Sequence, residues 1–217
     1  MDTRLSESTI DPVVERALIA TPEAVLDWAW AQFGDRCCVL ASMQDAAVIE
    51  LALRGGRQFP IVFLDTGYHF AETWATLRRV EQRYGIDVEV VGPRQTPRPD
   101  VQPGECCEDK ATLLEDALEG RLAWISGVRR HQTSNRASAE LVETDRRGFT
   151  KVNPVVQWSQ ADHQQFVQSA GVIENRLVDL GYPSIGCAPC TIPLRGGDYS
   201  RAGRWAETTQ TECGLHL

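Results

Sequence analysis

Short apolar segments alternate with longer helical segments along much of the chain, and this alternation limits the fold more than any other feature of the sequence. The apolar segments have the length of buried strands, and the segments between them carry apolar residues at helical spacing. Strands joined by helices form right-handed crossovers, so the sequence predicts an α/β fold, a parallel twisted sheet flanked by helices. The expected strands are 36–42, 60–65, 86–91 and 122–127, and the expected helices are 21–34, 44–56, 69–85, 105–118 and 159–171.

Capping residues mark the N-terminal starts of two of these helices. Thr21 followed by Pro22 is typical of a helix start, and Ser159 with Asp162 is typical of a capping box. Beyond Gly181 the sequence is rich in Gly, Pro and Arg and shows no clear periodicity. We expect an irregular segment at that end of the chain.

Charge and composition exclude some classes of partner. The chain of 217 residues is 42% apolar and 24% charged, with a formal net charge of −8, which disfavours a general nucleic-acid binder. No apolar stretch is long enough to span a membrane, and no secretory signal is visible, so we expect a cytoplasmic protein. Arginines nevertheless cluster at 129–136 and 195–204, which suits a small anionic ligand, although solvated faces would give the same pattern.

Seven cysteines in a chain without an export signal favour metal binding or catalysis over disulfides. Cys37 and Cys38 lie in an expected strand, and we expect both to be buried there as small apolar residues. The pairs 106–107 and 187–190 supply four thiolates, which fit either tetrahedral zinc or an iron–sulfur cluster. The adjacent pair favours the wider cluster, because neighbouring side chains diverge. A dithiol redox pair at 187–190 and a buried structural role for Cys107 are the alternatives.

Two loops follow expected strands at the edge where parallel sheets bind ligands. The loop "SMQD" runs straight into a helix, whose first N–H groups attract phosphate or sulfate. The loop "DTGYH" follows the next strand. Neither is a Walker A or GxGxxG sequence, so ordinary strand-to-helix turns remain an alternative for both.

Taken together, several motifs resemble the iron–sulfur branch of the sulfonucleotide reductase family, the assimilatory adenylyl-sulfate (APS) reductases. They extend over about residues 36–216, in the family's order, and the most specific are the last cysteine motif and the terminal one. The matching segments are "FLDTGYHFAETW", "PGECC", "WISGVRRHQTSNRA", "KVNPVVQWS", "GYPSIGCAPCT", "RAGRW" and "TECGLH".

The resemblance implies an adenine-nucleotide α-hydrolase-like (PP-loop) fold, a four-iron four-sulfur [4Fe-4S] cluster and thioredoxin as electron donor. It implies a single domain over 1–217, in which about 191–217 form a mobile tail with the nucleophile Cys213. The implied cluster ligands are Cys106, Cys107, Cys187 and Cys190. The implied substrate-binding residues are Ser42, Gln44, Asp45, Leu64, Asp65, Thr66, Gly67, Lys110, Arg129, Arg130, Arg136, Arg201, Arg204 and His216.

One departure from the family concerns Lys110. The family usually has three residues between the cysteine pair and its lysine, whereas "CCEDK" has two, so the role of Lys110 stays open at this point. His216 either assists the thiol or is an incidental residue of the tail.

The implied reaction is attack of the Cys213 thiolate on the sulfur of APS, which gives an S-sulfocysteine and AMP, followed by reduction by thioredoxin to release sulfite. Glu212 by itself disfavours the thiolate, and nearby arginines favour it. The cluster is expected to tune electrostatics and structure and not to cycle electrons.

Three alternatives remain at this point: a reductase of the 3′-phosphorylated substrate PAPS, an ATP-consuming PP-loop enzyme, and a zinc-stabilised binding module. The oligomeric state stays open.

Overall fold

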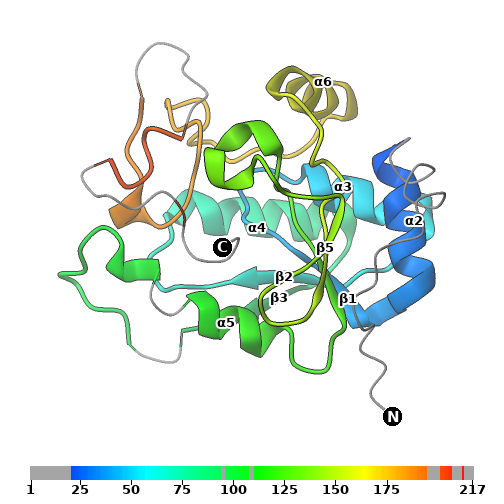
Figure 1. Cartoon of the computed structure of the whole chain (residues 1–217). Coiled ribbons are helices and arrows are strands. Elements are labelled where there is room, and N and C mark those ends of the chain that lie inside the picture. The colour runs from blue at the N-terminus through cyan, green and yellow to red at the C-terminus, as the bar shows by residue number, and fades with distance from the viewer. Residues whose placement is uncertain (1–20, 94–95, 108–109, 195–200, 207–211, 213–217) are drawn as a thin grey trace.

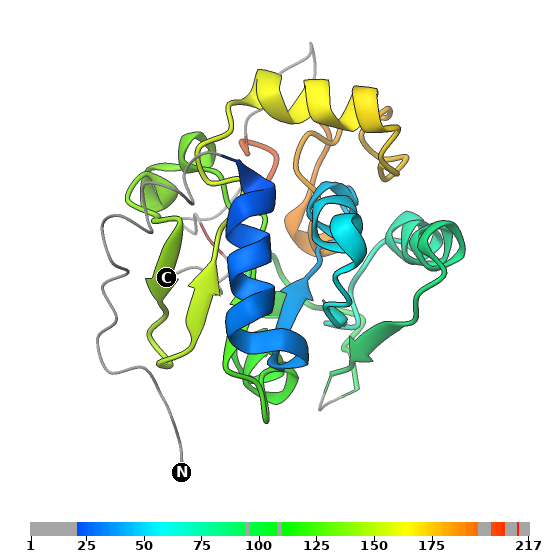
Figure 2. The ribbon, with the colours of Figure 1, turned by 90° about the vertical axis from the view of Figure 1, so that its right-hand side faces the viewer.

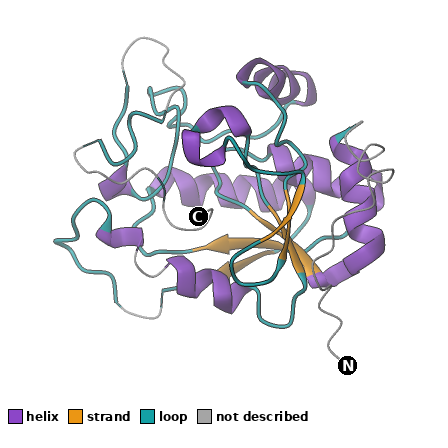
Figure 3. Ribbon diagram, in the orientation of Figure 1, coloured by secondary structure: helices purple, strands orange, loops and turns teal. Residues whose placement is uncertain are grey.

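A six-stranded sheet forms the centre of the molecule, with the strand order β3-β2-β1-β4-β6-β5 (Figures 1 and 3). The computed structural model describes residues 21–93, 96–107, 110–194, 201–206 and 212, with the side chain of Cys107 excepted. Neighbouring strands are parallel, apart from the antiparallel pair β5 and β6. The strands are β1 (Cys37–Leu40), β2 (Ile61–Leu64), β3 (Val88–Val91), β4 (Ala123–Ile125), β5 (Val142–Thr144) and β6 (Thr150–Val152).

Helices cover both faces of this sheet, α5 lying on the side opposite α3 and α4 (Figure 1). Figure 2 shows α6 lying across the top of the molecule, above α2 and α3. The described α-helices are α2 (Pro22–Phe33), α3 (Ala47–Leu53), α4 (Ala71–Tyr84), α5 (Lys110–Ala117) and α6 (Gln160–Ala170).

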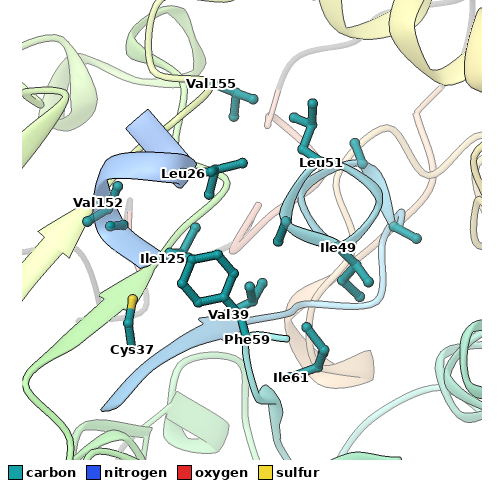
Figure 4. Close-up of a cluster of buried hydrophobic side chains, with 14 of the residues drawn as sticks. Leu26, Cys37, Val39, Ile49, Leu51, Phe59, Ile61, Ile125, Val152 and Val155 are labelled. Carbon is teal, nitrogen blue, oxygen red and sulfur yellow. The ribbon is translucent and has the colours of Figure 1, made fainter. Parts of the chain in front are cut away.

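Alternation along β1 divides the core into two layers, because successive side chains of a strand point to opposite faces. Cys37 and Val39 pack into the larger layer, with side chains of α2 and α3 such as Leu26 and Ile49 (Figure 4). Cys38 points the other way and packs against α5. Both cysteines are fully buried, which confirms the role expected for them.

The sequence predictions for strands and caps are largely confirmed. The four expected strands are β1 to β4, and the Thr21 hydroxyl accepts the Ala24 N–H at 3.2 Å. The Ser159 hydroxyl likewise accepts the Asp162 N–H at 3.1 Å, and the Asp162 carboxylate accepts the Ser159 N–H at 2.9 Å. The expected capping box therefore forms.

Two predictions of local structure need correction. The helix expected over 105–118 begins with a 3₁₀ turn at Glu105–Cys107, and α5 starts at Lys110. The hairpin of β5 and β6 was missed, because its strands have three residues each and mix polar with apolar side chains. The Asp145 carboxylate closes the hairpin by accepting the N–H groups of Arg147 at 2.9 Å and Phe149 at 3.0 Å.

Among the described residues, none of the helices has the length and apolar content needed to cross a membrane.

Candidate active site

A cavity of about 190 Å³ lies at the carboxyl ends of β1, β2 and β4. Segments that are far apart in the sequence form its wall, including the orange segment of residues 183–194 at the left of Figure 1. This is the edge at which open parallel sheets bind ligands. The sequence-predicted residues that line it are Ser42, Gln44, Asp45, Leu64, Lys110, Arg129, Arg136, Arg201 and Arg204.

The loop after β1 is held to a distant segment by the side chain of Gln44. Its amide nitrogen donates to the Pro183 carbonyl at 3.3 Å, and its amide oxygen accepts the Ile185 N–H at 3.1 Å. The amide therefore orders the wall of the cavity. Ser42, in the same loop, is exposed and lines the cavity.

Asp45 interacts with cationic and N–H groups of the protein. Its carboxylate accepts the Ala47 N–H at the start of α3 at 3.0 Å and lies 3.3 Å from His163 Nε2. Burial raises the pKa of Asp45, but His163, the Ala47 N–H and Arg129 outweigh burial and hold that pKa below its ordinary value. The carboxylate thus pairs with His163 and the start of α3, and its charge acts on Arg129.

Cations gather around the cavity on several elements. Arg129 is buried and donates to the Gln160 side chain at 3.3 Å, and burial lowers its pKa more than Asp45 raises it. An arginine stays charged even so. The Arg204 guanidinium lies over the Trp205 ring at 4.4 Å from its centroid. Lys110 is buried at the start of α5 and lines the cavity, so the shortened spacing does not remove it from this wall.

Arg130 lies apart from the cavity-lining arginines. Its side chain donates to the Ala139 carbonyl at 2.7 Å, and the residue does not line the cavity. Its neighbour Arg129, which was predicted together with it, does line the cavity. Sequence adjacency could not separate the two arginines.

The loop after β2 connects the cavity with the buried cysteines. The Asp65 carboxylate accepts the Gly67 N–H at 2.7 Å, which stabilises a turn in which Gly67 has a φ of +78°. The Thr66 hydroxyl lies 3.2 Å from Cys187 Sγ, so Thr66 faces the cysteines. His69 closes the loop by donating from Nε2 to the Leu64 carbonyl at 3.0 Å.

Three of the predicted cluster ligands pack together, although two distant segments supply them. Cys106, Cys187 and Cys190 are buried with Trp205 in one cluster of side chains. The Gly104 N–H donates to Cys190 Sγ at 3.2 Å. Hydrogen bonds from backbone N–H groups to sulfur are typical around thiolates that bind a metal or an iron–sulfur cluster.

Cys106, Cys187 and Cys190 are three of the four predicted thiolates, and thiolates are the donors that iron–sulfur clusters take. Among the described side chains, which exclude that of Cys107, no three His, Cys, Asp or Glu residues are placed to hold a single metal ion. Cys107 adjoins the buried Cys106 in the 3₁₀ turn at Glu105–Cys107, where the sequence places the fourth thiolate.

The carboxylate of Glu212 is buried against two arginines that line this cavity, Arg136 and Arg201. Arg136 donates to it through Nε at 2.7 Å and Nη2 at 2.9 Å. Arg201 and the Thr133 hydroxyl contact the same carboxylate at 3.4 and 3.1 Å. The predicted residues Cys213 and His216 lie outside the described residues.

Two non-glycine residues of the described chain adopt a positive φ, and both adjoin this site. Met43 has a φ of 58° in the loop after β1, and Trp205 has a φ of 52° next to Arg204. Such strained positions persist where the surrounding structure enforces them, and they concentrate at functional sites.

Sequence reasoning missed three residues of this site, which are His69, Gln132 and His163. His69 is the last residue of the loop "DTGYH", so a signal existed for it. Glu212 was expected to act on the Cys213 thiolate by its charge, and its pairing with Arg136 was not foreseen. His163 lies on α6, where nothing in the sequence distinguishes it from a surface histidine. Gln132 accepts from Arg136 Nη1 at 2.6 Å, a contact that depends on the fold of the arginine loop.

Comparison with known proteins decides the family. Residues 36–193 match the model of the phosphoadenosine phosphosulfate reductase domain. The chain belongs to this family. It is 44% identical over 209 residues to an adenosine 5′-phosphosulfate reductase of Streptomyces coelicolor, a match that covers 91% of this chain and 89% of the relative. It is 40% identical to the enzyme of that name in Mycolicibacterium smegmatis, with 99% and 98% covered.

Solved structures confirm that the fold extends beyond this reductase family. A phosphoadenylyl-sulfate reductase of Candida auris superposes with a TM-score of 0.68 at 21% identity, covering 86% of this chain and all of that one. A Candida glabrata FMN adenylyltransferase superposes with a TM-score of 0.63 at 15% identity, covering 88% of this chain and 70% of the other. The predicted PP-loop-type fold is therefore confirmed.

Proposed function

We propose that the protein reduces adenylyl sulfate to sulfite and AMP in assimilatory sulfate reduction, with Cys213 as the nucleophile. The observation that carries this function is the position of Glu212. This residue immediately precedes Cys213, and its buried carboxylate contacts Arg136 and Arg201, two arginines that line the cavity at the carboxyl edge of the sheet. The names of the relatives support the same substrate and an oxidoreductase that acts on sulfur.

The cavity suits a nucleotide that carries two linked anionic groups. Arg129, Arg204 and Lys110 offer cationic groups to the phosphate and the sulfate, and arginine binds such groups through paired N–H donors. The adenosine would lie along Leu64 and the loop after β2. Ser42 is an exposed residue of the cavity wall and would contact the phosphosulfate.

The first half-reaction forms one bond and breaks one. The Cys213 thiolate attacks the sulfur of APS, an S–S bond forms, and the bond between that sulfur and the bridging oxygen breaks. AMP leaves with the electron pair of that bond, and the enzyme keeps an S-sulfocysteine. Arginines offset the repulsion between the thiolate and the anionic substrate and stabilise the charge that develops on AMP.

The second half-reaction needs a dithiol donor, which we propose is thioredoxin. One thiolate of thioredoxin attacks the sulfur of Cys213, sulfite leaves, and the second thiol resolves the mixed disulfide. Cys213 returns to the thiol state, and thioredoxin becomes a disulfide. A reducing compartment supports this cycle, so the proposal includes the cytoplasm.

Cys106, Cys107, Cys187 and Cys190 would hold a [4Fe-4S] cluster. When bound, the cluster supplies a rigid connection between two distant chain segments and a fixed charge beside the cavity. Both electrons of the reaction come from thiol chemistry, so the cluster is not required to change its oxidation state.

The decisive experiment is anaerobic incubation with APS, followed by intact-mass measurement of the wild type and of Cys213→Ser. The wild type should gain the mass of one SO₃ group and release AMP, and the variant should gain nothing. Equal adducts on both proteins would contradict the proposal. Parallel incubations with PAPS and with ATP test the two other nucleotide chemistries, since turnover of ATP would release pyrophosphate.

A further inference from the structure

Glu212 is an unusually buried acidic residue. Its exposed fraction is 3%, and acidic side chains reach such burial only when they are paired. Burial raises its pKa, but hydrogen bonds and charge from Arg136, with Arg201 and Thr133, outweigh burial and hold that pKa below its ordinary value. The carboxylate is therefore ionised and bound at neutral pH.

The Arg136 guanidinium is committed to protein groups. Nε and Nη2 donate to the two oxygens of Glu212 in the paired geometry that matches a carboxylate. Nη1 donates to the Gln132 side chain at 2.6 Å. Gln132 in turn accepts the Arg129 N–H at 3.1 Å, which fixes its own position. Each nitrogen of the guanidinium thus has a protein partner.

The other cations of the cavity stand in a different relation to Glu212. Arg129 donates to Gln160, and Arg204 lies over the Trp205 ring. Both side chains line the cavity. Arg136 and Arg201 line the same cavity, but their side chains also donate to the Glu212 carboxylate.

We propose that Glu212 and Arg136 form a latch that positions Cys213 for attack, and that Arg136 serves this latch instead of binding the phosphosulfate. The inference rests on the proposed function, because it assumes that Cys213 is the nucleophile. Consecutive Cα atoms lie about 3.8 Å apart, so an anchor at Glu212 sets the starting point of the nucleophile. Both members of the latch are positioning residues.

The physical reason for such a latch is electrostatic. A thiolate that enters a site already occupied by an anionic substrate needs a compensating attraction elsewhere on its segment. The buried carboxylate supplies it, and removal of either partner leaves an uncompensated charge in a site shielded from water. Loss of the latch should slow the attack of Cys213, because the proposed contacts of the substrate with Arg129, Arg204 and Lys110 remain.

The test separates binding from attack in the iron-loaded enzyme. The variants are Glu212→Gln, Arg136→Gln and the double variant. APS affinity is measured by calorimetry with each change placed in the Cys213→Ser protein, in which no reaction occurs. The rate of SO₃ transfer is measured under single-turnover conditions by intact mass in proteins that retain Cys213.

The latch predicts unchanged affinity and slow attack. Each single variant should bind APS within about twofold of the parent and form the adduct about tenfold more slowly or worse. The double variant should be no slower than the slower single variant, because both changes break one interaction. Arg129→Gln should instead weaken APS binding by about tenfold or more. Glu89→Gln, which removes an exposed carboxylate paired with Arg121, should change neither quantity.

Two results would overturn the latch. One is an adduct rate for Glu212→Gln equal to that of the wild type. The other is a tenfold loss of APS affinity in Arg136→Gln, which would place Arg136 on the substrate. Thermal unfolding by circular dichroism confirms that each variant is folded, and Glu212→Asp provides a milder change in the same contact.

A further readout separates this inference from the proposed function. Alkylation of Cys213 by iodoacetamide without nucleotide, followed by peptide mapping, reports the latch alone. Glu212→Gln should change that rate by about fivefold or more, because the anchor of the segment is lost. An unchanged rate would contradict the latch. If Glu212→Gln changes the alkylation rate but the wild type forms no adduct with APS, the proposed reaction is refuted and the latch is supported.

Discussion

At the scale of single residues, the site depends on polar side chains whose partners come from distant parts of the chain. Asp45 shows this most clearly. Its place after β1 suggested an anion-binding loop, whereas its partners are His163 and the Ala47 N–H. The loop could be located from the sequence, because strand and helix patterns flank it. The partner on α6 could not, because it depends on how α6 packs against α3.

Asp45→Asn should lower the free energy of unfolding by about 2 kcal/mol at neutral pH, because it removes a charged acceptor from buried donors. The folded-state pKa of Asp45 is lowered, so its stabilising contribution is complete above the ordinary pKa of about 3.9. It is lost as pH falls through the lowered pKa. Urea unfolding of both proteins over an acid pH series measures this, and a difference that grows toward low pH would contradict it.

Gly186→Ala should weaken APS binding by about tenfold, because a Cβ at Gly186 would overlap the Arg204 guanidinium and displace it from the cavity. Gly92→Ala is the matched control, since a Cβ there meets no atom within 4 Å. Calorimetry in the Cys213→Ser protein measures both. Equal affinity in the Gly186 variant would show that Arg204 does not contact the substrate.

At the scale of elements, β1, β2 and β4 could be predicted because burial on both faces leaves a continuous apolar run. The edge strand β3 is more exposed, and its three valines favoured a strand. The β5–β6 hairpin lacks that signal, since it lies at the edge of the sheet and one of its ion pairs joins Glu143 to Lys151 at 2.6 Å. Its register depends on a turn and on the neighbouring strand. Short edge strands of this kind are set by tertiary contacts that no local pattern records.

Arg57 closes the end of α3 and is the residue on which that element should depend most. Its buried guanidinium donates to the Leu51 carbonyl at 2.7 Å and the Ala52 carbonyl at 3.1 Å, and it pairs with Asp27 of α2. Arg57→Ala should lower the free energy of unfolding by about 3 kcal/mol, because buried carbonyls at a helix end lose their donors.

Arg54→Ala provides the control for Arg57, because it removes a more exposed arginine that pairs with Glu50 at 3.0 Å. That change should cost about 0.5 kcal/mol. Urea unfolding at pH 7 measures both variants. Similar losses in the two would contradict the capping role of Arg57.

At the scale of the whole molecule, the cysteine cluster joins the segment before α5 to the segment of residues 183–194, and Lys110 at the start of α5 and Gly186 in the second segment line the cavity. Cys190→Ala should therefore abolish iron binding and lower the melting temperature, while the far-UV circular dichroism spectrum stays close to that of the wild type because the sheet has its own core. Cys38→Ala should keep its iron. Iron and sulfide analysis after anaerobic purification tests this, and full iron content in Cys190→Ala, or zinc in place of iron, would refute the assignment.

The two cysteines of β1 have a practical consequence. Burial raises the pKa of the Cys37 thiol and raises that of Cys38 to about 11, and the two sulfur atoms face opposite layers. A thiol-reactive dye added to the native protein therefore meets neither of them until the sheet itself comes apart. Labelling of Cys37 and Cys38 therefore reports global unfolding, and peptide mapping separates it from labelling of Cys213.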